Sequence, residues 1–257
     1  MTHPWFTGTS SPRVLAHRGF VPPDAEGIVE NSVAAFAAAH ATGAVYVESD
    51  CHLTADGVVV FFHDDDLRRV TGDPRAIAAV HHAELERIMA DRGGLATAAD
   101  TLSAFPTLRF NLDVKAAAAA RPVGRLVVPH ADRVLLTSFS DARRRDALDA
   151  ARHLGGEPAT SAGRATIARV LAAVSTGSAG LVARALRDVD ALQVPERQGA
   201  VRIVTPRLLR AAHAAGVEVH VWTVNDRDDM DRLLDLGVDG LVTDRADLAL
   251  QAVAARH

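Results

Sequence analysis

Residues 217–243 read VEVHVWTVNDRDDMDRLLDLGVDGLVT, and they carry the clearest structural pattern in the chain. The valine-rich run Val217–Val224 predicts a strand, and Gly240–Thr243 predicts a second one. Between them, Asp226–Leu236 predicts a helix, because the apolar residues Met230, Leu233 and Leu234 recur on one face. A strand, a helix and a strand in this order are typical of a protein built on a parallel sheet.

The same alternation extends outward over the whole chain. Helices are expected between the strands, for example at 141–153, 164–174 and 205–215. The predicted strands are Val14–Ala16, Ala44–Val47, Leu108–Val114, Val134–Leu136, Ala159–Ser161, Ala191–Val194, Val217–Val224 and Gly240–Thr243. Eight such repeats predict an α/β protein with a TIM-type (βα)8 barrel, and an open doubly wound sheet is the alternative. No linker divides residues 1–257, so we expect a single domain.

An extra strand is expected after the second barrel strand. Ala55-Asp56-Gly57 is a hairpin signal, and Val58–Phe62 returns as a strand that leads to His63. A turn centred between Ala55 and Asp56 would place Glu48 opposite His63, on one side of the ribbon. The hairpin is therefore predicted to bring a histidine back to the mouth of the barrel.

The composition argues against several classes of function. Hydrophobic residues make up 48% of the 257 residues and charged residues 23%, which is typical of a chain with a packed core. The net charge of −4 argues against binding to nucleic acid or to acidic membranes. The N-terminal residues do not resemble a secretory signal, and no run approaches the length of a membrane span, so no stable membrane insertion is expected.

Lysine and cysteine are both rare. Of the 28 basic residues only Lys115 is a lysine, and a coding bias towards arginine accounts for the rarity but not for the position. Cys51 is the single cysteine, so no disulfide can form within the chain. The cytoplasm is the simplest location for such a protein, with export as a partner of another protein as the alternative. The sequence leaves the oligomeric state open.

Polar residues collect where the predicted strands end, which is the reactive face of a parallel barrel. Glu48, Asp50 and Asp113 are three acids at such ends, and the first two face the same side of one strand. Crowded carboxylates need a compensating cation, and an all-oxygen ligand set favours one Mg²⁺ or Ca²⁺ ion, with Mn²⁺ as a further choice. The alternative is that these acids form surface ion pairs with arginines.

Two histidines and two cations adjoin the acids. His17 and His63 are candidates for the general acid and the general base. Arg18 and Lys115 offer a planar fork and a point charge, which suit an anionic group such as phosphate. The surroundings of Ser138 do not match Gly-x-Ser-x-Gly, so serine hydrolysis has little support. The predicted site is thus suited to a small anionic substrate.

The ordered set of motifs resembles the glycerophosphodiester phosphodiesterase family, a branch of the phospholipase C-like phosphodiesterases, over about residues 13–250. The segments that carry the resemblance are Ala16-His17-Arg18-Gly19, Glu30-Asn31-Ser32, Ala35-Phe36, Glu48-Ser49-Asp50, Leu53–Gly57, Val60–Asp64, Asn111–Lys115, Trp222–Asn225 and Asp239–Asp244. The resemblance implies a TIM-type barrel that uses a divalent cation to hydrolyse glycerophosphodiesters to glycerol 3-phosphate and an alcohol. The implied site residues are His17 and His63 for acid/base catalysis, Glu48, Asp50 and Asp113 for the metal, and Arg18, Lys115 and Trp222 for the substrate.

Three departures from the family pattern concern the site. Asp113 stands where the family usually has a glutamate and is one methylene shorter. The motif that contains Asn31 follows Val29 instead of a proline, after a longer loop. The stretch 71–102, which in the family forms a cap over the site, matches poorly. The choice of head group is therefore the part of the function that the resemblance defines least.

Two rival functions stay open at this point. A lysophospholipase D-like phosphodiesterase on the same barrel would need a hydrophobic channel, which Leu192, Val194 and Trp222 could line, although they are equally suited to the barrel core. A non-catalytic sensor would bind phosphodiesters without hydrolysing them. For the hydrolase, the nucleophile is either water or the glycerol 2-hydroxyl, and the order in which the two histidines act is also open.

Overall fold

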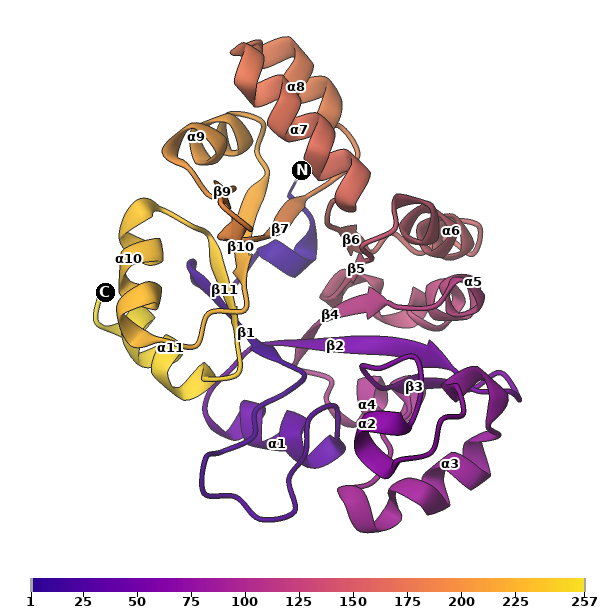
Figure 1. The fold of residues 1–257 in the computed structure, drawn as a ribbon. Coiled ribbons are helices and arrows are strands. Elements are labelled where there is room, and N and C mark those ends of the chain that lie inside the picture. The colour runs from indigo at the N-terminus through magenta and orange to yellow at the C-terminus, as the bar shows by residue number, and fades with distance from the viewer. Residues whose placement is uncertain (1, 257) are drawn as a thin grey trace.

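The computed structural model describes residues 2–256 and places eight parallel strands around a common axis (Figure 1). The barrel strands are β1 (Arg13–His17), β2 (Tyr46–Leu53), β4 (Arg109–Val114), β5 (Val134–Thr137), β6 (Ala159–Thr160), β7 (Ala191–Pro195), β10 (Glu218–Trp222) and β11 (Gly240–Thr243). Their order around the barrel is β6-β5-β4-β2-β1-β11-β10-β7, and a parallel bridge between Ser161 and Ala191 brings the two outer strands together. The predicted TIM-type barrel is confirmed.

Helices surround the strands, as Figure 1 shows. They are α1 (Val33–Ala41), α5 (Ala117–Leu126), α6 (Asp141–Arg152), α7 (Arg164–Thr176), α8 (Ala179–Leu186), α9 (Pro206–Ala214), α10 (Arg227–Leu236) and α11 (Ala246–Ala254), with a 3₁₀ turn η4 (Val128–Arg133) before β5. In α10 the buried residues are Met230, Leu233 and Leu234, as their spacing predicts. The helix begins after Asp226, whose carboxylate accepts from the backbone N–H groups of Asp228 and Asp229.

A short N-terminal 3₁₀ turn, η1 (Pro4–Phe6), closes the barrel at the end where the strands begin. Trp5 is completely buried there, and its indole N–H donates to the Phe110 carbonyl at 3.1 Å. Beside it, Arg13 at the start of β1 forms an ion pair with Glu218 at the start of β10, with an N···O distance of 2.7 Å. This end of the barrel is thus filled with side chains, which leaves the carboxyl ends of the strands as the open face.

Residues 54–104 lie outside the barrel, between β2 and β4, and appear at the lower right of Figure 1. They form β3 (Val59–Phe61), α2 (Arg68–Thr71), η2 (Ile77–Ala79), α3 (His82–Met89), η3 (Ala90–Arg92) and α4 (Ala98–Ala104). Val59 and Phe61 pack in the main core, whereas Val60 and Phe62 pack in a separate apolar cluster made by this segment. The strand β3 therefore joins two cores through its alternating side chains.

The predicted hairpin is present, but its register differs by one residue from the prediction. Cys51 of β2 lies opposite Phe61 of β3, because the turn contains three residues, 55–57, where the prediction has two. The N–H of Thr54 and the carbonyl of Val58 close this turn at 3.0 Å. His63 consequently does not lie opposite Glu48 and follows the end of β3 as part of the next loop.

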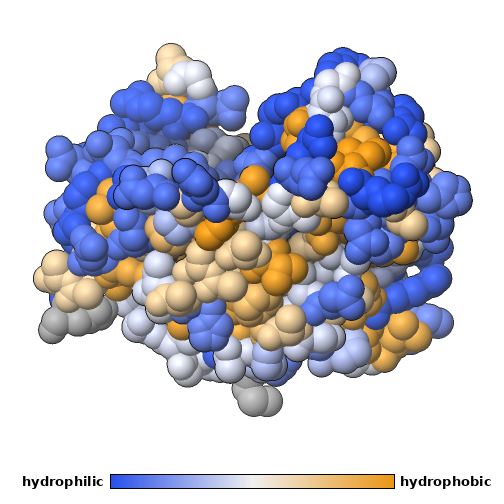
Figure 2. Space-filling model, turned by 90° about the horizontal axis from the view of Figure 1, so that it is seen from below, coloured by the Kyte–Doolittle hydropathy of each residue, from blue (hydrophilic) through white to orange (hydrophobic). Residues whose placement is uncertain are grey.

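The single cysteine and the absence of a predicted membrane span can also be compared with the structure. Cys51 is completely buried in the main core, where it is a packing residue. In the part of the chain that the structure describes, no helix has the length and apolar character needed to cross a membrane. Figure 2 shows one face of the molecule, on which hydrophobic patches alternate with hydrophilic residues and two hydrophilic lobes flank a notch.

Candidate active site

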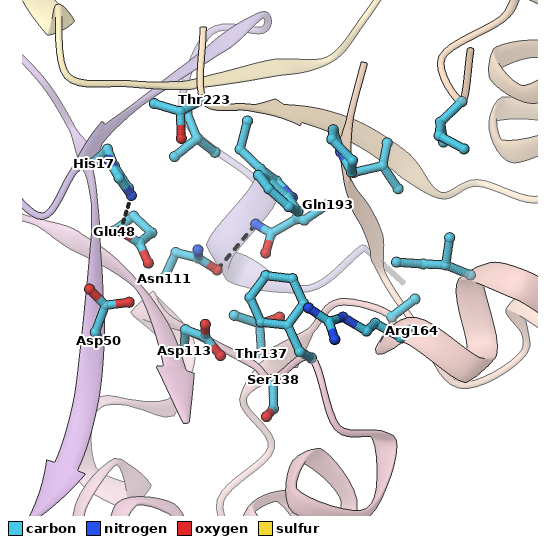
Figure 3. Close-up of a pocket in the computed structure, with 18 of the residues that line it drawn as sticks. His17, Glu48, Asp50, Asn111, Asp113, Thr137, Ser138, Arg164, Gln193 and Thr223 are labelled. Carbon is cyan, nitrogen blue, oxygen red and sulfur yellow. Dashed lines mark hydrogen bonds and ion pairs between the residues drawn. The ribbon is translucent and has the colours of Figure 1, made fainter. Parts of the chain in front are cut away.

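A cavity of about 570 Å³ lies at the carboxyl ends of the barrel strands. All eight residues that the sequence predicts for the site line it: His17, Arg18, Glu48, Asp50, His63, Asp113, Lys115 and Trp222. Figure 3 shows the three acids near His17 on one side of the cavity and Arg164, the first residue of α7, on the other. The barrel thus brings together side chains from distant parts of the chain, while their individual roles stay predictions.

The carboxylate of Asp244 holds His17 on the side of its ring that faces away from Glu48. Its Nδ1 lies 2.7 Å from Oδ1 of Asp244, and its Nε2 lies 3.9 Å from Oε2 of Glu48. Asn225 donates to the other oxygen of Asp244 at 2.6 Å and so orients the carboxylate. Burial by itself would lower the pKa of His17, but the hydrogen bond to Asp244 and the charge of Glu48 raise it above its usual value. Nε2 is the nitrogen left for proton transfer.

His63 is held in the same way, although it comes from the segment outside the barrel. Its Nδ1 lies 2.8 Å from Oδ1 of Asp64, and Arg69 donates to the second oxygen of that carboxylate. The shifted hairpin register therefore does not remove His63 from the cavity. Both histidines have Nδ1 fixed by a carboxylate, which sets the ring orientation and leaves Nε2 for chemistry.

Arg18 sits in an unusual backbone conformation, with φ of +55°. Its backbone N–H donates to Oε2 of Glu48 at 3.2 Å, and its Nη1 donates to Glu30 at 2.8 Å. The next residue, Gly19, has φ of +84°, and a Cβ there would lie 2.7 Å from the Cβ of Ala35. The turn therefore needs glycine at position 19, and it directs Arg18 into the site at some cost in backbone strain.

Lys115 connects two of the acids. Its Nζ lies 2.6 Å from Oδ2 of Asp113 and 2.8 Å from Oδ1 of Asp50. Burial by itself would raise the pKa of Asp50, but the charges of Lys115 and Arg18 lower it. Burial would also lower the pKa of Lys115, whereas the charges of Asp113 and Asp50 raise it. Lys115 is therefore a firmly protonated cation in the middle of the acidic cluster.

Two of the three acids lie in surroundings that disfavour their charged forms. Burial, together with the charge of Asp50, raises the pKa of Glu48, and burial also raises the pKa of Asp113. Oδ1 of Asp113 is buried and has no hydrogen-bond partner among residues 2–256. An orphaned carboxylate oxygen beside two further acids fits a divalent cation with a preference for oxygen ligands.

The acids are not arranged as a ready-made cage. Among residues 2–256, no three His, Cys, Asp or Glu side chains already surround a point that could hold a metal ion. Lys115 contacts two of the three carboxylates, so its ammonium group holds oxygens that a cation would share. The residues fit a divalent cation by their chemistry, and the metal site stays a prediction.

Asn31 and Asp244 contact predicted site residues, although the sequence assigned neither of them a catalytic or binding role. Asn31, with φ of +58°, donates to Oδ2 of Asp50 at 3.2 Å and accepts from Ser49. The neighbouring Ser32 caps α1, and Asn31 itself contacts the acids. Both residues fall within segments that resemble the family, and that resemblance is the sequence signal that could have identified them as part of the site.

The side of the cavity opposite the acids is largely apolar. Ile167, Ala168 and Leu171 line it from one face of α7, and Ile203 lines it next to a two-stranded hairpin, β8 (Arg197–Gln198) and β9 (Val201–Arg202). The rings of Phe139 and Trp222 meet edge to face at 5.6 Å on the same wall. Leu192, by contrast, is buried in the main core and does not line the cavity.

Comparisons with known proteins agree in fold and in family. A family model described as the glycerophosphoryl diester phosphodiesterase family matches residues 17–248. A probable glycerophosphodiester phosphodiesterase of Mycobacterium tuberculosis is 39% identical over 246 residues, which cover 94% of this chain and 90% of that protein. A lysophospholipase D of Rattus norvegicus is 24% identical, over 90% of this chain and 83% of its own length. The structure of an Oleispira antarctica phosphodiesterase with its product sn-glycerol 3-phosphate superposes with a TM-score of 0.71 at 21% identity, covering 95% of this chain and 97% of that one.

Proposed function

This chain belongs to the glycerophosphoryl diester phosphodiesterase family, and on that premise we propose that it hydrolyses glycerophosphodiesters to glycerol 3-phosphate and an alcohol. It is a phosphoric diester hydrolase. The observation that carries the proposal is the convergence, at one cavity, of two histidines held by carboxylates and two cations suited to phosphate. A cytoplasmic location is part of the same proposal, and it fits a chain whose single cysteine is a free thiol.

Three acids would hold one divalent cation, Mg²⁺ or Ca²⁺, with Mn²⁺ as a further choice. They are Glu48, Asp50 and Asp113, and the orphaned oxygen of Asp113 is the observation that supports this assignment. When bound, such a cation stabilises negative charge on phosphoryl oxygens. It would also keep Glu48 and Asp113 ionised, since burial alone raises the pKa of each carboxyl group.

Arg18 and Lys115 would hold the phosphate of the substrate. Both line the cavity, and each is already surrounded by the acids that orient it. A guanidinium group and an ammonium group placed before the substrate arrives stabilise the charge that develops on the phosphoryl oxygens without further reorganisation. The carboxylates of Glu30 and Asp50 contact the guanidinium group of Arg18 and fix the direction of its plane.

His17 and His63 would exchange protons with the substrate through Nε2. One histidine removes the proton of the nucleophile, and the other protonates the leaving alkoxide. Asp244 and Asp64 hold the opposite ring nitrogens, which fixes both orientations throughout the reaction. The nucleophile in this scheme is either water or the glycerol 2-hydroxyl. In the second case the alcohol leaves as a cyclic glycerol phosphate forms, and water then opens that ring to glycerol 3-phosphate with the roles of the two histidines exchanged.

The test replaces each histidine by alanine. His17→Ala and His63→Ala should each reduce turnover of glycerophosphoglycerol by about 10²- to 10⁴-fold while the fold is kept. His213→Ala is the matched control, because His213 also contacts a carboxylate, at 2.7 Å, but lies outside the cavity. Near-normal turnover in either site variant would contradict the assignment. The same assay with a chelator, followed by Mg²⁺, Ca²⁺ or Mn²⁺, tests the cation. Absence of chelator-sensitive activity on every diester tried would favour the sensor.

A second candidate substrate is a lysophospholipid, which the apolar wall of the cavity favours. Ile167, Leu171 and Ile203 offer a surface for an acyl chain within the same cavity as the predicted catalytic residues. Parallel kcat/KM values for lysophosphatidylcholine and glycerophosphocholine would separate the two substrates. A higher value for the lysolipid would make lysophospholipase D the principal activity.

A further inference from the structure

Arg164 is a cation of the cavity wall that the proposed mechanism does not use. It is exposed at the start of α7, and its guanidinium carbon lies 4.6 Å from the ring centre of Phe139 (Figure 3). Among residues 2–256, no carboxylate oxygen lies within 4.0 Å of a guanidinium nitrogen of Arg164, which is the limit for an ion pair. Asp141, the first residue of α6, accepts from the N–H groups of Ala165 and Thr166 at the start of α7. The charge of Arg164 is therefore available to a ligand.

The adjoining rim of the cavity carries more positive charge. In the β8–β9 hairpin, Arg197 lies directly opposite Arg202, an arrangement of like charges that destabilises a strand pair. Glu196 is the acid at this place, and it is shared between Arg202 at 3.6 Å and Arg232 at 2.8 Å. Gln198 of the same hairpin lines the cavity, whereas Arg197 and Arg202 project from the other face of the ribbon and do not line it. The hairpin therefore adds positive charge beside the cavity but not in its wall.

The aromatic pair on this wall is poorly suited to a cationic head group. Phe139 and Trp222 could otherwise bind a quaternary ammonium ion through their ring faces. Arg164 already lies over the Phe139 ring, and Lys115 Nζ lies 5.5 Å from the same ring centre. A choline or ethanolamine group placed at this wall would meet two positive charges.

Resting on the hydrolase function proposed above, we propose that Arg164 selects substrates whose leaving alcohol carries a second phosphate over substrates whose leaving alcohol is cationic. The charge can discriminate only through the leaving alcohol, because the glycerol moiety has no ionisable group. The geometry suits a short alcohol. Cζ of Arg164 lies 4.6 Å from the ring centre of Phe139, and Nζ of Lys115 lies 5.5 Å from the same point. The two cations are therefore at most about 10 Å apart. A planar guanidinium group also matches phosphate oxygens with two parallel hydrogen bonds.

The test compares three diesters that differ in the charge of the leaving alcohol. They are bis(glycerophospho)glycerol, which is anionic, glycerophosphoglycerol, which is neutral, and glycerophosphocholine, which is cationic. The wild-type kcat/KM should fall in that order, and Arg164→Gln should reduce the ratio of anionic to neutral substrate by about fivefold, as expected for an exposed ion pair. Arg164→Lys should keep most of the ratio, and added salt should reduce it in the wild type.

Arg210→Gln is the matched control, because it removes the same charge from an exposed position on α9 that does not line the cavity. The inference is overturned if the ratio in Arg164→Gln equals that in the control, if all three substrates lose activity equally, or if the wild type prefers the cationic substrate. Absence of hydrolysis of all three diesters would instead overturn the proposed function, and this inference with it. Normal activity with unchanged ratios overturns the inference alone.

Discussion

Asp244→Asn should reduce kcat/KM for a glycerophosphodiester by about tenfold. Oδ1 of Asp244 lies 2.7 Å from Nδ1 of His17, and the substitution keeps the shape of the side chain while removing its charge. A hydrogen bond to a charged group contributes about 1.5–3 kcal/mol, and each 1.4 kcal/mol is a factor of ten. The Asp244 side chain is 52% exposed, so solvent screens its charge and the lower end of that range applies.

The equivalent change at the other histidine should cost more. Asp64 lies 2.8 Å from Nδ1 of His63, and its side chain is only 22% exposed. Because its charge is less screened, Asp64→Asn should lower kcat/KM by clearly more than Asp244→Asn, towards about 100-fold. The two variants thus rank the two histidine supports by burial, with the same chemical change at each.

Release of glycerol 3-phosphate from glycerophosphoglycerol, followed over a range of substrate concentrations, measures both effects. Asp239→Asn is the matched control, since Asp239 lies 2.7 Å from His213 outside the cavity. Circular dichroism and thermal unfolding establish that each variant is folded. Wild-type kinetics in a folded Asp244→Asn protein would refute the argument that this carboxylate fixes His17, and a greater loss at Asp244 than at Asp64 would refute the ranking by burial.

Lys115→Arg should lower kcat/KM by at least about tenfold. A planar guanidinium group cannot reproduce the contacts of Nζ with Asp50 at 2.8 Å and with Asp113 at 2.6 Å. Wild-type kinetics in this variant would mean that the position of the single lysine is a compositional accident. Glu218→Gln should destabilise the protein at pH 7 by up to about 3 kcal/mol and hardly at all near pH 2. Burial by itself would raise the pKa of Glu218, but hydrogen bonds from Arg13 and His220 lower it from 4.5 to about 2. The stabilisation is therefore present above pH 4.5 and is lost as the pH falls towards 2, and urea unfolding of both proteins at several pH values measures it. A difference between them that does not change with pH would contradict this linkage.

The barrel could be predicted from the sequence because its signals are local. The run Val217–Val224 and the helical spacing in Asp226–Leu236 each specify one element, and eight such repeats leave few ways to bury all the apolar faces. The position of the site followed from the same reasoning, since the carboxyl ends of parallel strands meet at one face. This is why Glu48 in β2 and Asp113 in β4 could be placed together although they lie 65 positions apart in the sequence.

What could not be predicted depends on contacts between separate loops. The hairpin register changes with the number of residues in the turn, and Ala55-Asp56-Gly57 permits either a two- or a three-residue turn. The support of His17 by Asp244 joins the first and last strands of the barrel, and no local pattern indicates which of the 32 acids will reach it. Similarly, the free charge of Arg164 is apparent only when the surroundings of its side chain are known.

In the mechanism proposed above, catalysis depends on the segment between β2 and β4, because that segment supplies His63. His63 lies two residues after β3, and the nearby Val60 and Phe62 belong to the separate apolar cluster, whereas Val59 and Phe61 pack in the main core. Local opening of that cluster would carry His63 and Asp64 out of the cavity while the barrel stays folded. The enzyme would then consist of two cooperative units, and the less stable one would set the temperature at which activity is lost. Sequence change in this segment can likewise adjust activity without endangering the scaffold.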